Sequence, residues 1–321
     1  MYQVRTDLAL EVQEKIQEDK GEVKGVCFLE EKLDPNLVIS TVVIETENGA
    51  RLMHKPKGTY ITIEAGDMDE EDEGYHREIS EQLAKVLKRL IPEKKEDYEV
   101  LVVGLGNRGV TPDSLGPRVV DNLFITRHVI REYGKYAFGK EKVPHISSIV
   151  PGVIAQTGME SLEIIQGIVK ETRPDFIIVI DALAARSTKR LNRTIQVTDT
   201  GINPGSGVGN HRHGLNEKSL GIPVISIGVP TVVDAATIVN DTMSNLILAM
   251  TQSDHFKMIG SSLDELNEAE KYELIRELLS PNLNAMFVTP KDIDESVKRL
   301  SYTISEGLNI AFELDGVWKQ E

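Results

Sequence analysis

Two aspartates follow apolar segments that predict buried strands. Asp181 comes directly after the five apolar residues 176–180, and Asp113 lies beyond the apolar run 100–103 and four residues ahead of Pro117. Pro117 is suited to the first turn of a helix, so Asp113 is expected just before a helix. Because sites in open α/β sheets form beyond the carboxyl ends of strands, we expect both carboxylates to reach one crevice.

A pair of carboxylates in one crevice can activate water. Two acids that share a water cannot both ionise at low cost, so one keeps its proton near neutral pH. The ionised acid accepts a proton from the attacking water, and the protonated acid donates to the carbonyl oxygen of a peptide. Alone, Asp113 would be interpreted as a helix cap, and Asp181 as a buried acid satisfied by loop amides or by Arg186. The pair predicts hydrolysis of a peptide bond, with Asp113 and Asp181 as catalytic residues.

Other polar and glycine-rich positions near these aspartates are candidates for holding a substrate. The run 204–210 is dense in glycine but lacks the spacing of a phosphate-binding loop, which favours a lid or a cradle for a substrate main chain. The residues predicted to position substrate are Asn107, Arg186, Gly205, Ser206, Gly207 and Asn210.

Two further motifs offer alternative chemistry. Asp199-Thr200-Gly201 is the triplet of pepsin-like proteases, but the β-rich barrel that presents it there is not predicted, so a turn is favoured. His211 and His213 could bind a metal together with the two aspartates. Histidines two residues apart in a polar loop are more often solvated, and we predict neither a metal nor a cofactor.

Apolar strands alternate with helices over residues 99–250, which predicts a mostly parallel sheet covered on both faces. A helix is expected over residues 117–133. Residues 8–98 are interpreted as an N-terminal α+β unit, with strands at 37–45 and 59–64 separated by the turn signal Asn48-Gly49. Residues 251–321 are predicted to form a helical segment that packs on the core and contains an amphipathic helix at 292–312.

Composition excludes several classes of protein. The formal net charge is −15 and the isoelectric point is near 5.0, which disfavours direct binding to nucleic acid. No stretch is apolar enough for a membrane span, and the N-terminus has no apolar signal core. The single cysteine, Cys27, lies in an apolar run and is expected in the core, so no disulfide can form within the chain. A cytoplasmic protein is expected.

Long motifs across nearly the whole chain closely resemble the bacterial spore germination protease family. They are residues 103–127, 174–187, 205–210 and 228–235, with Arg5-Thr6-Asp7-Leu8-Ala9 at the N-terminus and residues 288–294 near the C-terminus. The resemblance implies an atypical aspartic endopeptidase that begins the degradation of small acid-soluble spore proteins during germination. Asp113 and Asp181 fall at the catalytic aspartates of that family.

The resemblance also implies a fold, an assembly and a maturation step. The expected fold is a three-layer α/β/α, phosphorylase/hydrolase-like arrangement with a mostly parallel central sheet, similar to hydrogenase-maturation peptidases, plus a smaller N-terminal β-containing unit. The expected assembly is a homotetramer in the forespore or spore core. The implied zymogen cuts itself between Asp7 and Leu8, so residues 1–7 are a short pro-segment ahead of a catalytic core at 99–250.

Three other functions compete with this one. A fainter resemblance to hydrogenase-maturation endopeptidases implies a metal-dependent endopeptidase that uses the same acids. Residues 103–107 look like the opening motif of peptidyl-tRNA hydrolases, although the negative charge argues against tRNA. A module that binds a small molecule or phosphate in the glycine-rich loops would bind without cleaving itself.

Overall fold

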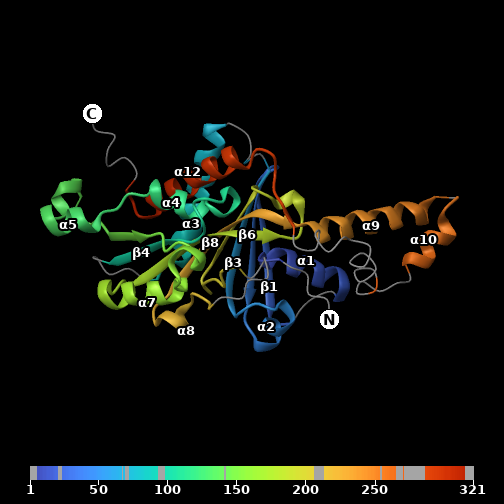
Figure 1. The fold of residues 1–321 in the computed structure, drawn as a ribbon, viewed down its shortest axis with the longest axis horizontal. Helices are drawn as coiled ribbons and strands as arrows, with labels where there is room; N and C mark the ends of the chain where they lie inside the picture. The colour runs from blue at the N-terminus through green and yellow to red at the C-terminus, as the bar shows by residue number, and fades with distance from the viewer. Residues whose placement is uncertain are drawn as a thin grey trace.

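The computed structural model describes residues 6–20, 24–66, 68, 72–92, 98–140, 142–205, 213–253, 255–264, 270 and 286–314. Within these residues the chain forms one nine-stranded sheet, ordered β1-β2-β3-β7-β8-β6-β4-β5, with β9 beside β8. Helices cover both faces of this sheet, as Figure 1 shows. The α/β class with a central sheet and helical layers is therefore confirmed.

The parallel part of the sheet carries the predicted site. It consists of β4 (Glu99–Gly104), β5 (His145–Ile149), β6 (Phe176–Ala185) and β8 (Val224–Asp234). Alternate residues of β4 enter opposite cores because successive side chains of a strand point to opposite faces. Val100 and Val102 pack in the core beneath α3 (Glu73–Leu90), α4 (Leu115–Asp121) and α12 (Ile293–Ala311). Leu101 and Val103 pack with Ile165 of α7 (Ser161–Thr172) on the other face.

The antiparallel part of the sheet contains β1 (Val26–Asp34), β2 (Leu37–Ile44), β3 (Gly58–Ala65) and β7 (Thr194–Thr198). The strands predicted at 37–45 and 59–64 are present as β2 and β3 and pair antiparallel. β3 pairs with β7, and β7 pairs with β8, so the N-terminal strands extend the central sheet. Strands from both sides of residue 98 share this one sheet. The division of the chain into units near residue 98 stays a prediction.

Three local expectations differ from the structure. The Asn48-Gly49 turn lies inside helix α2 (Glu47–Met53), where the Thr46 side chain caps the helix by accepting from Gly49 N at 3.1 Å. The helix expected over 117–133 is two helices, α4 and α5 (Arg127–Tyr133). Cys27 is exposed rather than buried, because β1 is the edge strand and most of its side chains face solvent.

The remaining elements are mostly peripheral. They are α1 (Ala9–Lys20), η1 (Thr111–Asp113), η2 (Lys135–Phe138), α6 (Ile154–Thr157), η3 (Thr188–Arg190), α8 (Glu217–Leu220), α9 (Ala235–Gln252), α10 (Lys257–Asp264) and β9 (Phe287–Val288). In Figure 1, α9 and α10 extend away from the layered body. No helix among the described residues has the length and apolar character needed to cross a membrane.

The buried carboxylate of Glu11 joins α1 to the segment that follows β6. Glu11 is only 4% exposed and accepts from Arg186 N at 2.8 Å and Ser187 N at 2.9 Å. We expect Glu11→Ala to lower the free energy of unfolding by about 2–4 kcal/mol, because two partly buried N–H groups lose their acceptor. Glu14→Ala, which removes an exposed partner of Arg190, should lower the free energy of unfolding by about 1 kcal/mol or less. If urea unfolding showed equal losses of stability for Glu11→Ala and Glu14→Ala, Glu11 would not be the residue that joins α1 to the segment after β6.

Candidate active site

The loop between β4 and α4 holds Asp113 by its own main chain. Asn107 N donates to Asp113 Oδ2 at 2.8 Å, and it also approaches the Asp113 carbonyl oxygen at 3.1 Å. Gly106 makes this approach possible: its φ is +115°, and a Cβ at this position would lie 1.9 Å from the Asp113 carbonyl oxygen. The loop therefore requires glycine at residue 106 to place the aspartate.

Contacts from three elements fix the short turn η1 that carries Asp113. Thr231 Oγ1 of β8 donates to Pro112 O at 2.7 Å, and Thr111 Oγ1 bonds to Asp294 Oδ1 of α12 at 2.8 Å. Gly116 lets α4 lie against the sheet, since a Cβ there would be 2.6 Å from Ile180 O of β6. Asp113 is thus held beyond the end of β4 and beside β6 and β8, which both continue past this point.

Asp181 is part of β6 and is only 6% exposed. Its Oδ1 accepts from Ala182 N at 2.9 Å. The residue beside it on β8 is Gly228, and the side chain of Leu183 fills the space above that glycine, where a Cβ would meet Leu183 Cδ1 at 2.4 Å. Asp181 thus stands in the sheet with a glycine beside it on β8.

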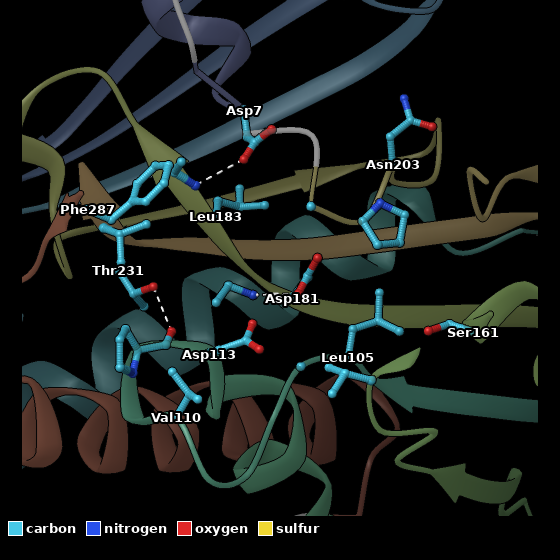
Figure 2. A pocket seen from close by; sticks show the side chains of 18 residues that line it. Asp7, Leu105, Val110, Asp113, Ser161, Asp181, Leu183, Asn203, Thr231 and Phe287 are labelled. Carbon is cyan, nitrogen blue, oxygen red and sulfur yellow. Dashed lines mark hydrogen bonds between the residues drawn. The ribbon is translucent and has the colours of Figure 1, made fainter. Parts of the chain in front are cut away.

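Asp113 and Asp181 line one pocket of about 330 Å³. Figure 2 shows the two carboxylates near each other, Asp113 from the loop and Asp181 from the strand. The convergence expected from the sequence is therefore present in the geometry. The pocket walls are largely apolar, and they include Leu105, Val110, Val153, Leu183 and Phe287.

Asp7, which precedes the bond predicted to be cut, lines the same pocket. Its N–H donates to Ala184 O at 3.0 Å, and its Oδ2 accepts from Ala184 N at 3.0 Å. Leu8 is fully buried in a cluster with Leu183, Ala185, Leu191 and Val233. In the view of Figure 2, Leu183 lies between Asp7 and Asp181. The N-terminal segment is therefore docked at the edge of the pocket that contains the two acids.

The residues predicted to position substrate have different locations. Gly205 lines the pocket, whereas Ser206, Gly207 and Asn210 lie outside the described residues. The Asn107 side chain braces the loop, as its Oδ1 accepts from Gly109 N at 2.9 Å and from Gln156 Nε2 at 3.1 Å. Arg186 is not among the described pocket-lining residues, and its N–H binds Glu11. Their roles toward a substrate stay predictions.

Asp199 and His213, which belong to the two alternative motifs, are not among the described residues that line the pocket. The Asp199 side chain accepts from Thr59 N at 2.8 Å and so stabilises the bend after β7, as expected for a turn. His213 Nδ1 lies 2.6 Å from Glu160 Oε2, and this hydrogen bond raises the pKa of His213. His211 is outside the described residues. Within the residues that are described, no group of three or more His, Cys, Asp or Glu side chains is arranged to hold a metal.

Comparison with known proteins identifies the family. The family model described as germination protease matches residues 4–258 and 249–317. The chain belongs to the germination protease family. Membership in this family makes the chain a peptidase, and it agrees with the resemblance of the long motifs around Asp113 and Asp181.

Curated members of the family align with nearly the whole chain. The germination protease of Caldanaerobacter subterraneus subsp. tengcongensis is 47% identical, and the alignment covers 97% of this chain and 94% of that protein. The protein of Clostridium perfringens is 44% identical, with coverage of 98% and 96%. That of Priestia megaterium is 40% identical, with coverage of 97% and 94%.

A solved structure with a partial likeness is a NiFe hydrogenase maturation protease from Thermococcus kodakarensis. It is 16% identical, and the superposition covers 70% of this chain and 99% of that chain with a TM-score of 0.31. Such a score is too low to support an argument about mechanism or about a metal. The nine-stranded sheet and the helices on both of its faces define the fold.

Proposed function

We propose that this chain is the endopeptidase that begins the degradation of small acid-soluble spore proteins during germination, and that it matures by cutting its own Asp7–Leu8 bond. The observation that carries the proposal is that Asp113, Asp181 and Asp7 line one pocket. Family membership supports the germination role. The aspartate pair supplies the chemistry, and the docked N-terminal segment supplies the first substrate.

The proposed reaction is a general acid–base hydrolysis. One ionised carboxylate of the Asp113–Asp181 pair removes a proton from a water molecule as its oxygen attacks the carbonyl carbon. The other carboxyl, protonated because two close acids resist double ionisation, delivers its proton to the departing nitrogen as the C–N bond breaks. The products are a new carboxyl group on residue 7 and a new amino group on Leu8.

The docked segment would also keep the uncut chain from cleaving other peptides. Asp7 occupies one edge of the pocket through two hydrogen bonds with Ala184, so an external peptide cannot bind the same main-chain atoms. Loss of residues 1–7 would free the Ala184 N–H and C=O for the main chain of a substrate. Recognition through main-chain groups suits an enzyme that acts on extended peptides.

Self-cleavage without a metal is the most direct test of this function. Purified full-length chain, incubated with and without an excess of a metal chelator, should lose the mass of residues 1–7 at equal rates. The trimmed chain should then cleave a purified small acid-soluble spore protein. Cleavage that stops with the chelator and returns with an added divalent metal would contradict the aspartate mechanism and favour the metal-dependent alternative.

The assembly and location are part of the same proposal. α9, α10 and Phe256 between them expose large apolar side chains, which suits burial against other copies of the chain in a homotetramer. They are Leu246, Leu248, Phe256, Met258 and Ile259. Sedimentation of the purified protein tests this assembly. We place the enzyme in the cytoplasm of the forespore and in the spore core, where it acts on its protein substrates without itself binding DNA.

A further inference from the structure

Gln196 of β7 binds the main chain on both sides of Leu8. Its Oε1 accepts from Ala9 N at 2.7 Å, and its Nε2 donates to Asp7 O at 3.2 Å. The side chain is only 6% exposed. One amide group thus pairs with the extended segment as a neighbouring strand would, and none of its bonds depends on the side chains of residues 7–9.

Lys55 supplies a second donor to the same oxygen. It follows α2, and its Nζ lies 2.9 Å from Asp7 O. Burial lowers the pKa of Lys55, while the carboxylates of Asp7 and Glu11 oppose that shift. The Asp7 carbonyl oxygen therefore lies within hydrogen-bond distance of the Gln196 amide and of the Lys55 amino group.

The register of the sheet places Gln196 on the same face as Asp181, one of the two proposed catalytic acids. Gln196 lies opposite Gly228 of β8, and Gly228 lies opposite Asp181 of β6. Residues in register on adjacent strands direct their side chains to the same face of a sheet. Gln196 and Asp181 therefore project from one face, with the side chain of Leu183 lying over Gly228 between them.

The oxygen held by Lys55 and Gln196 is the one whose charge changes during the proposed cleavage. When water attacks the carbonyl carbon of residue 7, negative charge develops on this oxygen. Donors placed around it before the reaction stabilise that charge. Asp113 and Asp181 act on the water and on the departing nitrogen, so the two pairs have separate tasks.

We propose that Lys55 and Gln196 form the carbonyl-oxygen site of the peptidase, first for the Asp7–Leu8 bond and then for the bond cleaved in a protein substrate. This inference rests on the proposed endopeptidase function. After residues 1–7 leave, the carbonyl of the substrate residue that precedes the cut takes the place of the Asp7 carbonyl.

The test compares Lys55→Met and Gln196→Met with Lys57→Met. Lys57 is two residues from Lys55, but its exposed ammonium pairs with Glu47 at 2.6 Å, so it is a matched control. The rate of self-cleavage is followed by intact mass. Each chain is then incubated until trimming is complete, and kcat and KM are measured on a separate spore protein substrate. Thermal unfolding checks that each variant is folded.

We expect each of the two variants to slow self-cleavage and to lower kcat on the separate substrate, both by roughly 10- to 100-fold, with KM changed far less. Lys55→Arg should recover part of the loss, and Lys57→Met should match the wild type. Slow self-cleavage with wild-type kcat would overturn the proposal, because the pair would then only anchor the N-terminal segment. Absence of cleavage by the wild type and by Lys57→Met would instead reject the endopeptidase function itself.

Discussion

Asp181→Asn should abolish self-cleavage and lower the cleavage of a spore protein by about 10⁴-fold or more, since an amide cannot exchange the proton that the reaction requires. The fold should persist. The amide oxygen of the new side chain can still accept from Ala182 N, the contact that Oδ1 makes at 2.9 Å. Intact mass, substrate cleavage and thermal unfolding together separate lost chemistry from lost structure.

Asp113→Asn should have an equally large effect for the same reason, because its amide oxygen can still accept from Asn107 N. The matched control is Asp121→Asn. Asp121 lies on α4 close in sequence, but it is half-exposed and pairs with Arg108 at 2.5 Å. Full activity in Asp181→Asn or Asp113→Asn would end the proposal of an aspartate pair, whatever the family relationship.

Gly106→Ala should have the second largest effect on cleavage, because it distorts the loop that positions Asp113. A Cβ at residue 106 would lie 1.9 Å from the Asp113 carbonyl oxygen, and the φ of +115° is a strained conformation for any side chain. We expect a loss of about 2–4 kcal/mol in the free energy of unfolding, from strain and overpacking together. We also expect cleavage to fall steeply in the fraction that remains folded, because Asp113 must move.

Gly221→Ala is the control for backbone strain alone. Gly221 has φ +74°, but a Cβ there meets no atom within 4 Å, so only the left-handed conformation is penalised. It should cost about 1 kcal/mol and leave cleavage unchanged. Urea unfolding and the rate of self-cleavage check both variants. Equal effects at residues 106 and 221 would show that the contact with Asp113 does not matter.

Much of the fold could be predicted from local patterns. The apolar runs 100–103 and 176–180 predicted β4 and β6 because strands covered on both faces need continuous apolar residues. The helical spacing of Ile293, Val297, Leu300 and Ile304 predicted α12. The position of Asp181 at the end of an apolar run, and of Asp113 ahead of a helix, was enough to predict that the two would line one pocket.

Features that depend on distant contacts could not be predicted in this way. Asn48-Gly49 favours a hairpin turn, but Thr46 caps a helix there and the two strands still pair on either side of it. The join between β3 and β7 depends on residues more than a hundred positions apart. No local sequence pattern marks Lys55 and Gln196 as functional residues. Their proposed role depends on contacts with the Asp7 carbonyl oxygen, which only the folded chain brings close to them.

In the proposed mechanism, Asp113 and Asp181 together hold the water that attacks one peptide bond. The most direct test is a crystal structure of the trimmed enzyme with a peptide that copies residues 4–10, in which a hydroxyethylene group replaces the cleaved bond. We predict that the hydroxyl lies within about 2.6–3.2 Å of both carboxylates. A hydroxyl bound away from either carboxylate, or a metal ion between the two acids, would contradict the account.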